Sequence, residues 1–201
     1  PKDKPRVCID GRNMIEKRPK IVEKRLEFGH FEGDFIESGR DGKGSLLVLV
    51  ERKTRYPFLA YLEDRSTKNV NQLIEKLLSD ISIKSLTLDN DLSFQKHEEL
   101  SELLEATVFF CHPHSPHEKG TVENRNKAIR RYVKKKSDLS KYSKEFFGGV
   151  ERKLRTRFMT CLNYKTPKED FDIEMEKLKL KKPQQCGMMT RELLVNLECS
   201  A

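Results

Sequence analysis

The chain has 201 residues, a length that suits one domain with a single hydrophobic core. Charged residues make up 36% of the sequence and the formal net charge is +8, which favours a polyanionic partner over an apolar one. We expect no membrane partner, because no apolar run approaches the roughly 20 residues of a membrane helix and no secretory pattern opens the chain. Five scattered cysteines without a C-x-x-C pair are typical of a reduced, cytoplasmic protein.

Composition divides the chain into three zones. Residues 1–28 are basic and poor in large apolar side chains, which predicts an arm or linker. Residues 29–170 alternate strand and helix patterns and form the predicted domain. Residues 171–201 form a C-terminal tail to which the sequence assigns no role. Because the chain starts at Pro1 rather than Met, we expect it to be a fragment of a longer protein.

The first part of the domain predicts an antiparallel meander. Period-two alternation or β-rich composition indicates three strands, at residues 31–36, 45–51 and 55–62. The glycines of "GRDGKG" (39–44) do not have the spacing of a phosphate-binding loop, so we interpret them as a hairpin turn.

Helix and strand patterns alternate in the rest of the domain. Apolar residues at helical spacing between Val70 and Leu78 predict a helix that Ser66 or Thr67 caps. The later elements are a strand "SLTLD" (85–89), a helix around Leu100–Leu104, a strand "TVFF" (107–110), a helix from about Lys119, and a helix near 145–163. This order predicts an α/β fold, with a mixed sheet of about five strands and helices on both faces.

Three histidines lie close together in the segment between the last predicted strand and the helix from Lys119. They could supply nitrogen ligands to zinc: His112, His114 and His117. Pro113 and Pro116 favour an extended segment, and no cysteine or carboxylate pattern nearby suggests a fourth ligand. We therefore expect a loop that faces phosphate or solvent and holds no structural zinc.

The helix from Lys119 places Glu123 among cations. Residues 118–136 contain eight Lys or Arg and two Glu, which is a net +6 of the chain's +8. At about 100° per residue, the core side holds Val122, Ile129 and Val133, and the side of Glu123 holds Lys127, Arg130 and Lys134. The alternative is a solvated helix face with ion pairs of the i,i+4 type, such as Glu123 with Lys127.

Three acidic residues form a candidate metal site. Asp34 lies on the first strand, Asp89 closes the fourth strand, and Glu123 lies on the later helix. A sheet of this order would place Asp34 and Asp89 side by side, so we expect the three carboxylates to converge. Without metal they would repel one another and raise each other's pKa. Two bound Mg²⁺ ions about 3.5–4 Å apart would turn this repulsion into attraction. They would bind the attacking and leaving oxygens of a phosphodiester.

Several blocks of the sequence carry a resemblance to a known family: "GHFEGDFI" (29–36), "LVERKTRY" (49–56), "LTLDND" (86–91), "HPHSPHEKGTVENRNKAIRRY" (112–132) and "LNYKTP" (162–167). Together with "IDGRNMIEKRPKIVEKR" (9–25), they resemble the catalytic domain of DDE transposases of the insertion sequence thirty family. The resemblance covers most of the chain up to about residue 170, and the 33 residues between Asp89 and Glu123 match the family's spacing. It implies the ribonuclease-H-like fold that these enzymes share with retroviral integrases.

The resemblance also implies an activity. Asp34, Asp89 and Glu123 match the catalytic triad, which would hold two Mg²⁺ (or Mn²⁺) ions, and Asn90 and Asn124 match positions beside it. The implied enzyme is a polynucleotidyl transferase that cuts DNA at the ends of an insertion element and joins them to target DNA. It would act as a homo-oligomer on DNA, in the bacterial cytoplasm with the nucleoid. The residues that we expect to contact DNA are His114, His117, Lys119, Lys127, Arg130, Arg131 and Lys134.

The sequence departs from the family pattern in three places. Residues 91–94 replace a usual Gly-x-Glu-Phe, residues 134–136 replace Pro-Lys-Gly, and residues 155–158 replace Asn-x-Arg-Pro. The family's amino-terminal helix-turn-helix, which reads the element ends, has no counterpart in the sequence. Two alternatives therefore stay open, a non-catalytic DNA-binding relic of a transposase and a ribonuclease-H-like nuclease.

Overall fold

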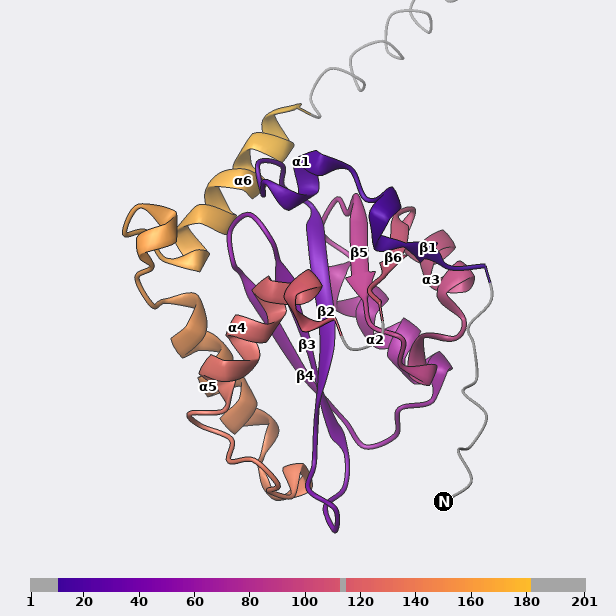
Figure 1. Cartoon of the computed structure of the whole chain (residues 1–201). Helices are drawn as coiled ribbons and strands as arrows, with labels where there is room; N and C mark the ends of the chain where they lie inside the picture. The colour runs from indigo at the N-terminus through magenta and orange to yellow at the C-terminus, as the bar shows by residue number, and fades with distance from the viewer. Residues whose placement is uncertain (1–10, 113–114, 182–201) are drawn as a thin grey trace, which may run out of the picture.

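A six-stranded mixed sheet forms the centre of the protein, whose computed structural model describes residues 11–112 and 115–181 (Figure 1). The strands are β1 (Asn13–Met14), β2 (His30–Glu37), β3 (Ser45–Glu51), β4 (Pro57–Leu62), β5 (Ser85–Leu88) and β6 (Thr107–Phe110). Their order is β1-β6-β5-β2-β3-β4. β2, β3 and β4 form the predicted antiparallel meander, whereas β5 pairs parallel to β2, β6 to β5 and β1 to β6.

Helices cover both faces of this sheet, as the sequence predicts (Figure 1). The α-helices are α1 (Lys20–Glu23), α2 (Thr67–Leu78), α3 (His97–Leu104), α4 (Gly120–Ile129), α5 (Lys144–Arg155) and α6 (Pro167–Lys181). Short 3₁₀ turns connect them: η1 (Ile15–Lys17), η2 (Leu92–Phe94), η3 (Pro116–Lys119), η4 (Leu139–Lys141) and η5 (Thr160–Leu162). Ser66 occupies the cap position of α2, but its side chain makes no capping hydrogen bond.

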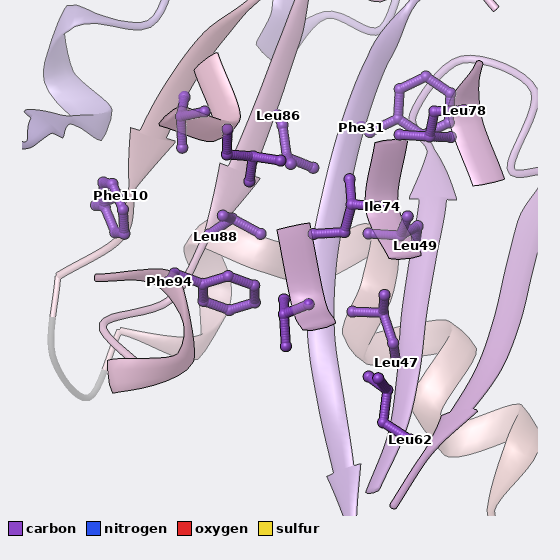
Figure 2. Close-up of a cluster of buried hydrophobic side chains, with 13 residues drawn as sticks. Phe31, Leu47, Leu49, Leu62, Ile74, Leu78, Leu86, Leu88, Phe94 and Phe110 are labelled. Carbon is purple, nitrogen blue, oxygen red and sulfur yellow. The ribbon is translucent and has the colours of Figure 1, made fainter. Parts of the chain in front are cut away.

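Strand β3 separates two apolar cores because its side chains alternate between the faces of the sheet. Leu47 and Leu49 belong to the core under α2 and α3, and Figure 2 shows them with Phe31, Leu86 and Leu88. The opposite face belongs to the core under α4 and α5, with Leu46, Val48, Val50, Val122, Ile129, Phe147 and Val150. All seven residues of β3 are buried, which is expected for a central strand covered on both sides.

The turn between β2 and β3 contains the predicted hairpin glycines. Gly44 has φ +77°, and a Cβ there would lie 2.4 Å from the hydroxyl oxygen of Tyr61. Only glycine adopts this backbone without strain in so little space. The structure thus confirms the hairpin interpretation.

The segments at both ends of the described chain pack onto the sheet. β1 pairs with β6, and Val22 and Phe28 are buried. Phe171 of α6 stacks on Tyr56 with ring centroids 4.1 Å apart and meets Phe28 edge-on. Residues 11–28, which we expected to belong to an arm or linker, therefore contribute to the folded unit, and the expected boundary at residue 170 falls inside α6. The division of the whole chain into three zones stays a prediction.

Two helices end earlier than the sequence predicts. α4 stops at Ile129, where the α-helical bonds give way to i,i−3 bonds from the Arg131 N–H to the Ala128 carbonyl (3.2 Å) and from the Tyr132 N–H to the Ile129 carbonyl (2.9 Å). This turn buries Val133 as expected, but it leaves Lys134 outside the helix. α5 ends at Arg155, where the N–H of Thr156 closes the last turn on the Arg152 carbonyl. Within residues 11–112 and 115–181, no helix has both the length and the apolar character needed to cross a membrane.

Candidate active site

Asp34 and Asp89 lie at the same level of two neighbouring parallel strands. β2 and β5 pair with Glu32 opposite Thr87, and each aspartate follows one member of that pair by two residues. Adjacent strands run about 4.7–4.9 Å apart, so this register brings the two side chains to one point of the sheet. We call these two residues the aspartate pair.

Lys119 bridges the aspartate pair. Its Nζ lies 3.0 Å from Asp34 Oδ1 and 3.3 Å from Asp89 Oδ2, and its side chain is only 8% exposed. The Nδ2 of Asn126 donates to Asp34 Oδ2 at 2.7 Å, so both oxygens of Asp34 are bound. Asp89 Oδ1 is buried and has no hydrogen-bond partner. The pair therefore has one resident cation and one oxygen that is still available.

The electrostatics of this cluster favour a cation. Burial raises the pKa of Asp89, the Lys119 ammonium opposes that shift, and the charge of Asp34 adds to it. Burial also opposes the charge of Lys119, but the two carboxylates outweigh it, and its pKa is raised. Lys119 is thus protonated at neutral pH and supplies the positive charge that two adjacent carboxylates require.

A buried glutamate fixes the start of α4 against the sheet. Glu32, which is fully buried, pairs with Arg52 and accepts the backbone N–H of Val122 at 2.8 Å. Glu123 follows Val122 directly, and Asn126 lies three residues further on the neighbouring part of the helix surface. Because Asn126 reaches Asp34, the side of α4 that carries Glu123 is held next to the aspartate pair.

The three carboxylates nevertheless do not form a closed cluster. Among residues 11–112 and 115–181, no three His, Cys, Asp or Glu side chains are placed to hold a metal ion. The expected convergence of Asp34, Asp89 and Glu123 into a metal site is therefore not seen among the described residues, and their assignment as the metal-holding triad stays a prediction. One physical reason is charge, because a single ammonium between two carboxylates leaves the pair with a net charge of about −1, which repels a third carboxylate when no metal is bound.

The turn after Asp89 departs from the family pattern and is held by its own contacts. Asn90 Nδ2 donates to the Cys111 carbonyl at 2.6 Å, and its Oδ1 accepts a hydrogen bond from Arg12. Asp91 accepts the N–H of Ser93 at 2.8 Å and pairs with Arg65 at 2.7 Å. These contacts fix the backbone that carries Asp89 from both sides.

The histidine segment is described only in part. His112 lies between two carboxylates, Glu118 at 2.9 Å and Glu16 at 2.7 Å, and its hydrogen bond to Glu118 raises its pKa. His114 lies outside the described residues, and His117 lies in η3. The absence of a structural zinc stays a prediction.

The cations expected to contact DNA occupy different environments. Lys127, Arg131 and Lys134 are exposed, and Arg130 is half-buried with its Nη1 3.3 Å from the Lys134 carbonyl. Lys119 is buried against the aspartate pair instead of facing solvent. A contact of these residues with DNA stays a prediction.

Three residues of the site were not found from the sequence. Glu32 and Arg52 are 20 positions apart, and no local pattern pairs them. Asn126 could have been found, because it lies at i+3 from Glu123 and residues at that spacing are neighbours on a helix.

Comparisons with known proteins show what this chain is similar to. No protein-family model matches the chain. It is 36% identical over 158 residues to transposase InsI for element IS30A of Escherichia coli (strain K12), a match that covers 77% of this chain and 41% of that protein. The chain is homologous to transposases of the IS30 family. It is also 35% identical over 165 residues to the transposase for element IS4351 of Bacteroides fragilis, covering 81% of this chain and 50% of that protein. The present chain thus spans about half the length of these relatives.

Solved structures give the same fold. The catalytic core domain of the BIV integrase superposes with a TM-score of 0.60 at 18% identity, over 76% of this chain and 98% of that chain. A chain in the structure of the simian T-cell lymphotropic virus intasome in complex with the PP2A regulatory subunit B56 gamma matches with a TM-score of 0.57 at 14% identity, over 69% of this chain and 52% of that chain. The predicted ribonuclease-H-like fold is therefore confirmed, with six strands in place of about five.

Proposed function

We propose that this chain is the catalytic domain of a transposase that cuts DNA at the ends of an insertion element and joins them to target DNA. The observation that carries the proposal is the aspartate pair, two carboxylates at one level of neighbouring strands around a buried cation. Homology to transposases of insertion elements supports the reaction class.

Asp34, Asp89 and Glu123 are the residues that would hold Mg²⁺ or Mn²⁺. Their oxygens suit hard cations, and the buried, unpartnered Oδ1 of Asp89 is one available ligand. Two such ions, when bound, supply positive charge to the attacking and leaving oxygens of a phosphodiester. Asn126 orients Asp34, and the bond from Val122 to Glu32 holds the helix that brings Glu123. Lys119 competes with a metal ion for the same aspartate oxygens.

The partners follow from the same proposal. DNA is the substrate, both as element end and as target, and the net charge of +8 favours its phosphates. We propose that the protein acts as a homo-oligomer on DNA, in the bacterial cytoplasm with the nucleoid. His114, His117, Lys127, Arg130, Arg131 and Lys134 are the proposed DNA contacts outside the aspartate pair.

A non-catalytic, DNA-binding descendant of a transposase is the second candidate. The ammonium of Lys119 between the two aspartates favours it, because a lysine that never leaves would exclude metal. The two candidates differ in one property, since only the enzyme turns over DNA when Mg²⁺ or Mn²⁺ is added.

The deciding experiment measures nicking and joining of DNA ends by the full-length protein with Mg²⁺ or Mn²⁺. We expect activity that is lost in Asp89→Asn and in Glu123→Gln, while DNA binding persists. Asp80→Asn removes an exposed acid at the end of α2 and is the matched control, which should remain active. Activity of the wild type that survives in Asp89→Asn or Glu123→Gln would refute the site. A wild type that binds DNA but never cuts it would favour the non-catalytic candidate.

A further inference from the structure

A second cluster of positive charge lines a pocket of about 630 Å³ beside α4. We call it the basic pocket, and its cations are Arg25, Arg55, Arg125, Lys127, Arg131 and Arg157. No Asp or Glu is among its lining residues. The cations come from four separate segments, namely the N-terminal segment, the β3–β4 connection, α4 with the turn that follows it, and the connection between α5 and α6.

The basic pocket and the aspartate pair lie on opposite sides of α4. At about 100° per residue, the pocket residues Thr121, Asn124 and Ala128 point roughly opposite to Asn126, which binds Asp34. Glu123 lies between the two directions. The pocket is therefore distinct from the aspartate pair but adjoins the helix that would complete the active site.

The arginines of the basic pocket have only neutral partners. Arg125 is 5% exposed, and its guanidinium donates to the Arg55 carbonyl (3.1 and 2.5 Å) and contacts the sulfur of Met159 (3.2 Å). Arg25 and Arg55 both donate to the one hydroxyl of Thr121, each at 3.4 Å, and Arg25 Nε is buried without a partner. In the part of the chain that the structure describes, none of the six cations forms an ion pair with a carboxylate.

Lys127, Arg131 and Arg157 are exposed, so the electrostatic cost of the cluster falls on the buried Arg125 and the partly buried Arg25 and Arg55, and an anion in the pocket would lower it. Buried charges without an opposite charge carry a large desolvation cost. Burial, and after it the neighbouring charge of Arg55, lowers the pKa of Arg125 to about 10. Arginine in turn is well suited to phosphate, since its planar fork of N–H donors matches the oxygens.

An exposed aromatic ring at the pocket narrows the class of anion. Phe158 lines the pocket and is 68% exposed, so its ring is free to meet a planar ligand. Cations combined with exposed aromatic side chains are typical of sites for single-stranded nucleic acid, where phosphates pair with Arg or Lys and bases stack on rings.

We propose that the basic pocket binds one phosphate of an unpaired DNA strand while Phe158 stacks on the adjacent base. The choice of DNA as the ligand rests on the proposed function. The inference that the pocket binds an anion rests on its cations alone. The source of the phosphate is a strand that is not base-paired, such as a frayed or displaced end. Free inorganic phosphate and acidic polypeptide are the competing occupants that the test must separate.

The first test measures binding by the full-length chain in EDTA, with single-stranded and duplex oligonucleotides of arbitrary sequence. Arg157 is exposed, so Arg157→Ala should keep the fold and flatten the log–log salt slope on single strands by about 0.7. Phe158→Ala should weaken single-strand binding about fivefold or more and fully paired duplex binding less, and Phe158→Tyr should restore it. Arg152→Ala removes an exposed arginine outside the pocket and is the control, which should bind like the wild type.

The second test uses Cys161, an exposed cysteine that lines the pocket. In a variant with Cys8, Cys186 and Cys199 changed to Ser, Cys161 is the reactive thiol, because Cys111 is buried. We expect a single-stranded oligonucleotide to slow the alkylation of Cys161, and Arg157→Ala to remove that protection. Polyglutamate and inorganic phosphate at equal charge should protect far less.

The possible outcomes separate this proposal from the proposed function. Equal protection by polyglutamate or inorganic phosphate would overturn the DNA assignment, as would single-strand binding that Arg157→Ala and Phe158→Ala leave unchanged. Protection by DNA in a protein that never cuts DNA would support the pocket while the proposed function fails. If the protein cuts DNA but DNA does not protect Cys161 from alkylation, the pocket proposal is overturned and the proposed function is not.

Discussion

Replacing Lys119 by Met tests whether its ammonium is the resident counter-ion of the aspartate pair. Methionine keeps most of the apolar stem and removes the charge that lies 3.0 and 3.3 Å from the two carboxylate oxygens. The variant leaves two adjacent carboxylates, one of them with a buried oxygen that has no partner. Stability of the metal-free protein should therefore fall.

The expected size follows from the burial of the cluster. Removing one partner of a buried ion pair costs roughly 3–5 kcal/mol. Asp89 is 39% exposed, so solvent screens part of the repulsion and we expect a loss of about 3 kcal/mol, at the low end. For a chain of this size, that corresponds to a fall in Tm of about 6–12 °C.

Added metal ions should restore part of the stability that Lys119→Met loses. In the wild type, Mg²⁺ or Mn²⁺ has to displace the ammonium, whereas in Lys119→Met the carboxylates are unpaired and bind a cation more tightly. Each 1.4 kcal/mol of lost competition is about a tenfold gain in affinity. Added metal should therefore raise the Tm of Lys119→Met more than that of the wild type, through preferential binding to the folded state.

The assay is thermal unfolding in EDTA and across a Mn²⁺ series, with Mn²⁺ affinity from titration calorimetry. Lys119→Arg keeps a cation and should retain most of the stability, and Lys76→Met removes an exposed lysine of α2 as the control. Equal Tm values for Lys119→Met and the wild type in EDTA, together with equal Mn²⁺ affinity, would refute the reasoning. Lys119 would then be a lysine that lies near two acids without balancing their charge.

Three further outcomes are expected. Glu32→Gln should lower the free energy of unfolding by about 3 kcal/mol in urea, because it leaves the buried Arg52 without its counter-charge, whereas Glu37→Gln, in an exposed pair, should change it by less than about 1 kcal/mol. Changing both Lys127 and Arg130 to Ala should flatten the log–log salt slope of duplex binding by roughly 1 to 2 units on every sequence, and an unchanged slope with an intact circular dichroism spectrum would place the DNA elsewhere. Metal analysis of the purified protein should find no stoichiometric zinc, and the contrary result would be one equivalent that is lost on changing His112, His114 and His117 to Ala.

The sheet could be predicted from the sequence because its signals are local. Alternation in residues 31–36 and the glycine turn at 39–44 define the hairpin, and the short apolar run that ends before Asp89 has the length of a buried strand. The two residues of β1 carry no such signal, since only their pairing with β6 makes them a strand. The end of α4 was also misplaced, because Val133 is apolar at a helical spacing but reaches the core through a turn.

The composition of the site could be predicted more easily than its charge balance. Charge counting identifies Lys119 as a cation, but it does not show that the side chain is buried between two acids. Likewise, Glu32 alternates along β2 like a solvent-facing residue, yet it is fully buried because Arg52 and the N–H of Val122 satisfy it. Pairings between distant segments decide both cases, and no single segment contains them.

The contacts of α4 connect the aspartate pair to the basic pocket through one rigid element. Glu32 fixes the start of the helix to β2, Asn126 fixes the next turn to Asp34, and Arg125, about 100° around the axis on the pocket side, binds the carbonyl of Arg55. A displacement of α4 toward the aspartate pair would therefore have to break bonds on its pocket side. If the pocket takes a DNA strand, the phosphate would hold those arginines in place of their neutral partners and lower the cost of that displacement. Binding of the strand and approach of Glu123 to Asp34 and Asp89 would then be coupled through the same helix.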